Sequence, residues 1–265
     1  MNLSLIPKPV RRVLSWGAFR AMDLRDLRRK EPRKIVWILG HMRSGSTLLM
    51  HLLGSHAQIL GAGERNLRYE SAVDLRKLEI VTFAARRKLW TDYDYVVDQI
   101  NHGRFVPEPS LLDHPRIYRI FLVREPGPTL ASMVQVLGKI YGLTVEQSAE
   151  YYRARLGELQ NAACRAADPR RSFLVRYEDL LRDSPSTLAG LSSFLELDSP
   201  LGETYEIFEF TGKRGDPSER IQAGKIRRDL PPRHVDLPAA VRHELETLHQ
   251  ESVASLERSC FKPYP

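Results

Sequence analysis

The amino-acid sequence predicts an α/β protein with a mostly parallel central sheet and helices on both of its faces. Short apolar runs rich in β-branched residues alternate along the chain with longer helical patterns, which is typical of strands separated by helices. The first apolar run, residues 35–39, leads at once into a glycine-bounded loop and a helical pattern. At 265 residues the chain has the length of one such domain, and no break in composition marks a second domain.

The loop after the first predicted strand has the composition of an anion site. Residues 40–47 read Gly-His-Met-Arg-Ser-Gly-Ser-Thr, and the helical pattern begins directly behind them. Free N–H groups and the positive end of the helix dipole would converge there. The spacing is that of a P-loop, but Ser46 stands where a nucleotide triphosphatase carries lysine, and the cation is Arg43. We therefore expect a P-loop-type three-layer α/β/α fold and a nucleotide other than a triphosphate; an ordinary glycine-rich turn is the alternative.

The remaining elements continue the alternation of strands and helices. Strands are predicted at residues 58–62, 93–99, 116–123 and 172–176, and helices at 69–90, 128–137, 145–167, 184–197 and 237–259. In parallel sheets, ligands bind at the carboxyl ends of the strands. The candidate site residues are therefore those that follow each strand: 43–47, Glu64, Gln99, Arg124 and Tyr177.

We expect a single domain over residues 1–265 with four parts. Residues 1–33 form a basic N-terminal helical extension, 34–197 the core, 213–232 a polar, basic, proline-rich loop, and 237–259 a C-terminal helix. Within the extension, apolar side chains alternate with arginines over residues 10–29. Such a helix either packs on its own domain or makes peripheral contact with an anionic membrane surface.

Composition limits the classes of partner and compartment. The net charge of +7 favours anionic ligands, but no basic run is interleaved with aromatic residues, so we expect no nucleic acid partner. Cys164 and Cys260 lie far apart without metal-ligand spacing, which predicts free thiols and no metal site. No apolar stretch reaches the length of a membrane span, and the N-terminus lacks the apolar core of a signal peptide. These features predict a cytoplasmic protein.

A second informative stretch follows the strand predicted at 116–123. Arg124 ends this strand, and Ser132 lies one turn into the next predicted helix. Such an arginine supplies a fork of donors and the serine a hydroxyl, so the two can bind one phosphate. Taken singly, each residue has an equally good structural explanation. Arg124 could be the partner of a structural ion pair, and Ser132 an ordinary serine on the face of a helix.

Together the two stretches resemble the sulfotransferases that use 3′-phosphoadenosine 5′-phosphosulfate (PAPS). The loop at 40–47 is similar to the loop by which that family binds the 5′-phosphosulfate. The sequence FLVREP at 121–126, with a serine eight residues after its arginine, is similar to the family's 3′-phosphate motif. The match continues through VRYEDLLRDSP at 175–185, so the resemblance covers roughly residues 35–197.

The resemblance implies roles for particular residues of this chain. Arg43 and the loop residues behind it would hold the 5′-phosphosulfate, Arg124 and Ser132 the 3′-phosphate, and Tyr177 would lie near the nucleotide. Glu64 follows Arg43 by twenty-one residues, as the glutamate base does in the tyrosylprotein branch of the family. The loop at 213–232 would cover the cofactor, with Ser218 and Lys225 touching it, although their spacing differs from the family pattern by one residue. The implied cofactor-binding residues are Arg43, Ser44, Gly45, Ser46, Thr47, Arg124, Ser132, Tyr177, Ser218 and Lys225.

Two departures from the family pattern remain open at this point. Gln99 occupies a place where related enzymes often carry lysine, so either Gln99 is a neutral donor or His102 or Lys225 supplies the charge. Many cytosolic members use a histidine base after this strand, so His102 is the alternative to Glu64.

The reaction implied is metal-free, in-line sulfuryl transfer from PAPS to a hydroxyl acceptor, with adenosine 3′,5′-bisphosphate as product. The acceptor is a small molecule, a glycan or a tyrosine. The basic loop either attracts an acidic acceptor, or clamps the doubly phosphorylated cofactor, or is simply a solvated basic face. A P-loop kinase using ATP, suggested by Asp98 at the end of a strand, is one alternative. A non-catalytic nucleotide-binding scaffold is the other.

Overall fold

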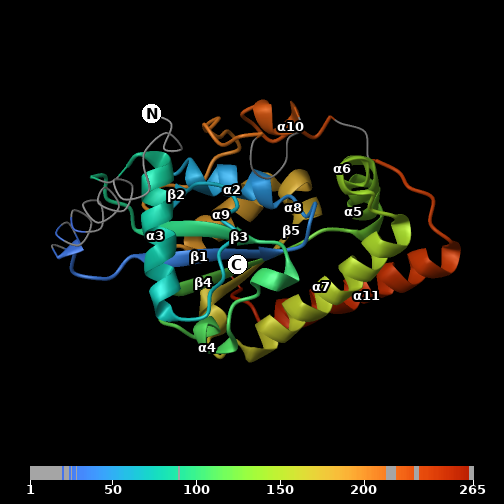
Figure 1. Ribbon diagram of the computed structural model, residues 1–265, viewed down its shortest axis with the longest axis horizontal. Coiled ribbons are helices and arrows are strands. Elements are labelled where there is room, and N and C mark those ends of the chain that lie inside the picture. Colours follow the sequence, from blue (N-terminus) through green and yellow to red (C-terminus); the bar gives the residue numbers. More distant parts are fainter. Residues whose placement is uncertain are drawn as a thin grey trace, which may run out of the picture.

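The structure is a computed structural model that describes Arg20, Leu24, Asp26, Leu27 and residues 29–88, 90–212, 219–229 and 233–262. Most of the predicted N-terminal extension at 1–33 lies outside the described residues. So do Ser218, with residues 213–217, and three residues at the end of the predicted cofactor-covering loop, 230–232. A core of strands and helices follows from Lys34 onward (Figure 1).

The centre of the fold is a parallel sheet, as the sequence predicts. Among the described residues it has five strands in the order β2-β3-β1-β4-β5, and every pairing is parallel. Strand β1 lies between β3 and β4, with Ile38 opposite both Gln99 and Ile120. The strands are β1 (Lys34–Gly40), β2 (Ile59–Gly61), β3 (Tyr95–Ile100), β4 (Ile117–Val123) and β5 (Ser172–Arg176).

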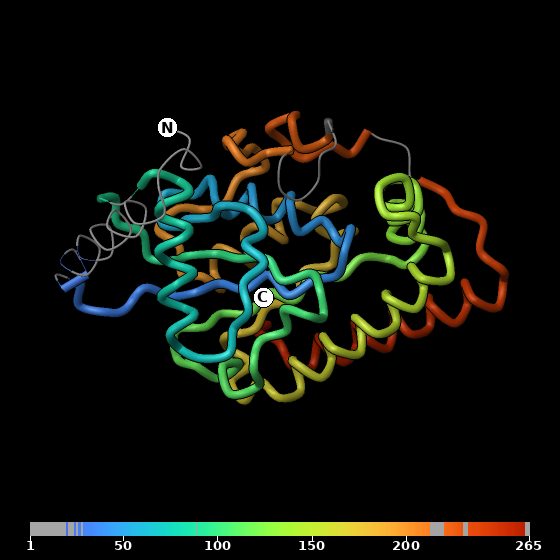
Figure 2. The backbone as a smooth tube through the Cα atoms, in the orientation of Figure 1, coloured from blue at the N-terminus to red at the C-terminus, as the bar shows by residue number. Residues whose placement is uncertain are grey.

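Helices cover both faces of this sheet, which gives the predicted three-layer α/β/α architecture (Figure 1). The longest helices, α7 and α11, run side by side along one face (Figure 2). The described helices are α2 (Ser46–Gly54), α3 (Ala72–Arg86), α4 (Pro109–Leu112), α5 (Pro126–Ser132), α6 (Gly138–Tyr141), α7 (Val145–Arg165), α8 (Tyr177–Arg182), α9 (Ser184–Phe194), α10 (Glu219–Gln222) and α11 (Ala239–Arg258).

The side chains of β1 alternate between two apolar cores because successive residues of a strand point to opposite faces. Trp37 is fully buried in the core that includes side chains of α3, α7 and α11. Its neighbours Val36 and Ile38 are fully buried in the other core, with side chains of α2, α8 and α9. Burial on both faces explains why this strand reads as a continuous apolar run.

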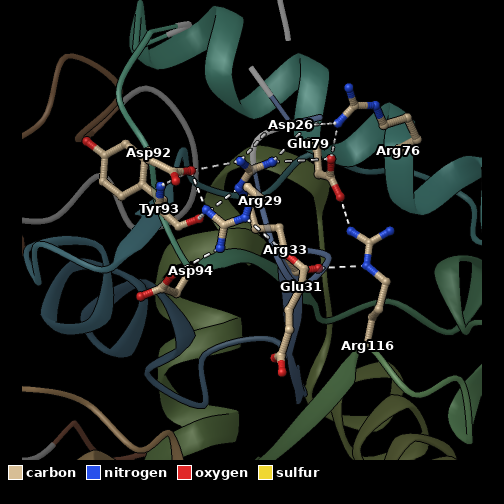
Figure 3. A network of polar contacts seen from close by, with 10 residues as sticks. All are labelled: Asp26, Arg29, Glu31, Arg33, Arg76, Glu79, Asp92, Tyr93, Asp94 and Arg116. Atoms are coloured by element: carbon tan, nitrogen blue, oxygen red, sulfur yellow. Dashed lines mark hydrogen bonds and ion pairs between the residues drawn. The ribbon is translucent and has the colours of Figure 1, made fainter. Parts of the chain in front are cut away.

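A network of ion pairs closes the edge of the sheet where the strands begin (Figure 3). Glu79 of α3 is only 2% exposed and pairs with Arg33, Arg76 and Arg116. The side chain of Arg33, 1% exposed, also pairs with Asp26 at 2.9 Å. Buried charges are tolerated when they are paired and hydrogen-bonded in this way. The network therefore fixes the entry of the chain into β1 against α3.

Several predicted boundaries differ from the structure. The helix predicted at 128–137 begins earlier, at Pro126, and becomes a π-helical segment over Met133–Leu137. A proline suits a first turn, and both Pro126 and Pro128 are available for it. The predicted loop at 213–232 contains a short helix, α10. In the part of the chain that the structure describes, no helix combines the length and apolar character needed to cross a membrane.

Candidate active site

The loop between β1 and α2 forms the floor of the site. Gly45 has φ 98° and caps α2, and Arg43 has φ 65°, so the loop turns twice through the left-handed region. The first N–H groups of a helix have no acceptor within it, so those of Ser46 and Thr47 are placed to receive an anion. Ser44 differs from its neighbours, because it is fully buried and its N–H donates to the His41 carbonyl at 3.1 Å.

The guanidinium groups of two arginines meet at Ser132, at the end of α5. Arg43 Nε donates to Ser132 Oγ at 2.9 Å, and Arg233 Nη1 donates to the same oxygen at 3.1 Å. Arg124 Nη1 donates to the carbonyl of Arg43 at 3.1 Å. Both motifs of the sequence therefore meet at one point. Arg233 was not predicted: it lies one residue beyond the predicted loop and 101 residues from Ser132, and only its basic surroundings hint at a role.

The backbone of Arg124 is held by a buried histidine and a buried tyrosine. Arg124 N–H donates to His41 Nε2 at 3.1 Å, and the Tyr152 hydroxyl donates to the Arg124 carbonyl at 2.7 Å. Burial lowers the pKa of His41 to about 3, so its ring is neutral at pH 7. With Nε2 accepting, Nδ1 carries the proton and donates to the Met42 carbonyl at 3.0 Å. The arginine is therefore fixed relative to the loop.

Tyr177 is the first residue of α8 and packs against the loop. Its ring lies against Gly45, and the guanidinium carbon of Arg124 lies 4.3 Å from the ring centroid. A cation over an aromatic face is attracted by the ring quadrupole, which helps to hold Arg124 in place. The predicted position of Tyr177 directly after β5 is thus also a position in the site.

Glu64 follows β2 and Gly63, and its carboxyl group is a weaker acid than an ordinary glutamate. Burial, and secondly the charge of Asp98, raise the pKa of Glu64 to about 7, against the opposing effects of Arg104 and Asn101. A carboxylate with a pKa near the working pH is suited to general base catalysis. His102, the alternative base, has a lowered pKa because of burial and the charges of Arg104 and Arg155.

Asp98 is buried beneath the site and has its own hydrogen-bond partners there. It is 1% exposed, and its carboxylate accepts from the Tyr69 hydroxyl at 2.6 Å and from the Arg65 N–H at 3.0 Å. It does not line the cavity described below. Its position therefore does not support the kinase alternative, in which this aspartate would have to hold a metal ion beside the loop.

Gln99 is placed differently from the sequence prediction. It lies inside β3, which ends at Ile100, and it is 2% exposed rather than open to a ligand. With its amide nitrogen facing Ser46, it donates to Ser46 Oγ and to the Ser46 carbonyl, both at 3.1 Å, and its oxygen accepts from the Glu64 N–H at 3.0 Å. Gln99 is therefore beneath the site and not on its surface.

One cavity of about 1040 Å³ brings the predicted residues together. The predicted site residues that line it are Arg43, Gly45, Ser46, Thr47, Glu64, His102, Arg124, Ser132, Tyr177 and Lys225. Ser44 does not line it, and Ser218 lies outside the described residues. Glu64, Glu125 and Glu178 are its acidic lining residues. Its basic lining residues are Arg43, Arg104, Arg124, Arg220, Lys225, Arg227, Arg228 and Arg233, so the excess charge is positive even though Arg227 and Arg228 pair with Asp229 and Glu203.

Comparisons with known proteins agree with this geometry. Residues 110–201, which include Arg124, Ser132 and Tyr177, match the model of the sulfotransferase family. This stretch of the chain is similar to sulfotransferases. No curated protein matches it by sequence.

Solved structures of sulfotransferase domains share the fold of this chain. The domain from the curacin biosynthetic pathway has a TM-score of 0.59 and 19% identity, covering 88% of this chain and 100% of that domain. The domain from the olefin synthase of Synechococcus PCC 7002 has a TM-score of 0.54 and 20% identity, covering 89% of this chain and 98% of that domain.

The donors that line the cavity can be compared with the anionic groups of PAPS. PAPS carries two separated anionic groups, at its 5′ and 3′ positions. The N-terminus of α2 with Arg43 provides one set of donors, and Arg124 with Arg233 provides a second set of charged donors. Guanidinium groups bind phosphate oxygens through charge-assisted hydrogen bonds. The residues present are therefore compatible with this cofactor.

Proposed function

We propose that this protein is a sulfotransferase that moves a sulfuryl group from PAPS to a hydroxyl acceptor, with Glu64 as the general base. The observation that carries the proposal is the meeting of the two arginine motifs with the start of α2, in a cavity that Glu64 also lines. The charge excess of this cavity and the raised pKa of Glu64 support it independently.

Two groups of donors would hold the nucleotide. Arg43 and the N–H groups of Gly45, Ser46 and Thr47 would bind its 5′ end. Arg124, Ser132 and Arg233 would bind the 3′-phosphate, with Arg233 added to the predicted residues because it shares the hydroxyl of Ser132 with Arg43. Lys225 and Tyr177 line the same cavity and would contact the remainder of the nucleotide.

The chemistry depends on charge stabilisation and on one proton transfer. Bound PAPS supplies the sulfuryl group. Arg43 and the loop N–H groups would stabilise the negative charge that develops on the departing 5′-phosphate. Glu64 would accept the proton of the acceptor hydroxyl. In-line transfer needs these groups held in fixed positions, which the hydrogen bonds around Arg124 and Arg43 provide.

The acceptor is a hydroxyl-bearing molecule, and the basic residues at 220–228 favour an acidic one. Lys225 is exposed and lines the cavity, as Arg220 does. An acceptor with its own carboxylate, phosphate or sulfate would be attracted to this side of the cavity.

A turnover assay tests the proposal. The protein is incubated with PAPS and a panel of hydroxyl acceptors, including tyrosine peptides, glycans and small alcohols, and released adenosine 3′,5′-bisphosphate is measured. We expect one class of acceptor to accelerate release, and Glu64→Gln to lower turnover by about 10²- to 10⁴-fold. The affinity for adenosine 3′,5′-bisphosphate should stay nearly unchanged in this variant. Full turnover by Glu64→Gln would remove Glu64 from its role as base.

A further inference from the structure

Gln99 connects the nucleotide loop to the segment that carries Glu64. Its amide nitrogen donates to Ser46 Oγ and to the Ser46 carbonyl at 3.1 Å, and its oxygen accepts from the Glu64 N–H at 3.0 Å. Ser46 is the first residue of α2, and Glu64 follows β2. The amide thus bridges two segments that are adjacent in space and eighteen residues apart in sequence.

The hydrogen bond from the Gln99 amide determines where the hydroxyl proton of Ser46 can be donated. A hydroxyl has one proton to donate, and its oxygen accepts from other groups. Because the Gln99 amide donates to Ser46 Oγ, the proton of Ser46 is directed to another acceptor. Ser46 lines the cavity at the start of α2, so an anion bound there is the acceptor within its reach.

A carboxylate at position 99 would reverse this polarity. It accepts hydrogen bonds and does not donate them. It would therefore take the proton of Ser46 for itself and add a negative charge beneath the anion. A carboxylate would also keep the bond from the Glu64 N–H, so Gln99→Glu changes the donor to Ser46 while preserving size and shape.

We propose that Gln99 is a positioning residue, which directs the Ser46 hydroxyl toward the 5′ end of the nucleotide and fixes the backbone of Glu64 beside it. The inference rests on the proposed function, because the anion at Ser46 is the bound nucleotide. A glutamine in the interior of a parallel sheet is costly to bury unless its amide is satisfied. The side-chain amide of Gln99 is satisfied by Ser46 of the loop and by the backbone of Glu64, the proposed base.

A double-mutant cycle tests the link to Ser46. The affinity for adenosine 3′,5′-bisphosphate is measured by calorimetry for the wild type, Gln99→Met, Ser46→Ala and the double variant. We expect Gln99→Met to weaken binding by about three- to tenfold when Ser46 is present, and by less than about twofold in the Ser46→Ala background. Gln99→Glu should weaken binding more strongly than Gln99→Met. Equal losses from Gln99→Met in both backgrounds would overturn the proposal.

Controls separate this role from a loss of folding. Thr82→Val replaces a fully buried polar side chain of α3 that does not line the cavity, and should leave the affinity unchanged. Hydrogen exchange at the Glu64 amide tests the second link without any nucleotide. In Gln99→Met this amide should exchange faster, whereas in Gln99→Glu it stays protected. Unchanged protection in Gln99→Met would overturn the link to Glu64.

The two proposals fail in different ways. If the wild type does not bind the bisphosphate, the proposed nucleotide is wrong, and with it the role of Gln99 toward Ser46. If the wild type binds and the cycle is additive, the proposed function stands and Gln99 has no positioning role.

Discussion

The ring of Tyr177 lies so close to Gly45 that a Cβ at position 45 would come within 2.3 Å of Cδ2 and 2.5 Å of Cε2. Gly45 also has φ 98°, which side chains rarely adopt. The close approach joins the loop after β1 to the start of α8, and it leaves no room for any other residue at the turn. The position of the Tyr177 ring, at the start of α8, therefore requires glycine at position 45 of the anion loop.

Gly45→Ala is expected to abolish tight binding of adenosine 3′,5′-bisphosphate. The new Cβ forces either the Tyr177 ring or the loop to move, and Arg124 rests on that ring. The matched control is Gly157→Ala in α7, where a Cβ would meet nothing within 4 Å. This control should stabilise the protein by about 0.5–1 kcal/mol and bind normally. Calorimetry and thermal unfolding of both variants check the prediction, and normal binding by Gly45→Ala would contradict it.

Arg233→Ala should weaken binding only for ligands that carry a 3′-phosphate. Loss of a charge-assisted hydrogen bond costs about 1.5–3 kcal/mol, so the affinity for adenosine 3′,5′-bisphosphate should fall by roughly 10- to 150-fold. The affinity for adenosine 5′-monophosphate should change little, and Arg124→Ala should behave in the same way. Arg170→Ala removes an exposed arginine outside the cavity and serves as the control. Equal losses for both nucleotides would show that Arg233 does not recognise the 3′-phosphate.

Glu64→Gln should make the ligand-free protein more stable at high pH. The folded protein raises the pKa of Glu64 from 4.5 to about 7. The stability gained from protonated Glu64 is therefore complete below pH 4.5 and is lost as the pH rises through 7. At pH 8 the free energy of unfolding of the variant should exceed that of the wild type by on the order of 1–3 kcal/mol. At pH 5 the difference should be much smaller. Urea unfolding at both values measures this, with Glu251→Gln on the exposed side of α11 as control. A difference independent of pH would refute the raised pKa.

The pH dependence of turnover should distinguish Glu64 from His102. In the free enzyme, kcat/KM should rise with pH and reach half its maximum near pH 7, because Glu64 must lose its proton. Replacement of His102 by Asn should keep this rise, since burial lowers the pKa of His102 below its ordinary value of 6.5. If the rise lies well below pH 7 and disappears in His102→Asn, then His102 is the base.

Local patterns predicted most of the fold, because each strand and helix carries its own apolar periodicity. The alternation of strands and helices predicted a parallel sheet with helices on both faces, and the observed sheet confirms it. The ends of strands and helices were predicted less accurately. The third strand was predicted to end at Gln99, but Ile100 continues the pairing with β1.

The parts of the site that escaped prediction depend on contacts between distant residues. Arg233 meets Ser132 across 101 residues of sequence, and no local pattern separates it from the other basic residues near the loop. The sequence left open whether Gln99 is a neutral donor to the ligand, because its partners, Ser46 and Glu64, could not be inferred from the strand itself. Ser44 belongs to the loop by sequence, yet its N–H is directed to His41 and its side chain is buried.

The most direct test of the central claim is calorimetry with adenosine 3′,5′-bisphosphate in EDTA, run beside ATP with magnesium. The cavity geometry predicts that the bisphosphate binds without magnesium, that it binds more tightly than magnesium-ATP, and that Arg124→Ala weakens it. Preference for magnesium-ATP would support a kinase, and binding of neither nucleotide would contradict the proposed cofactor site.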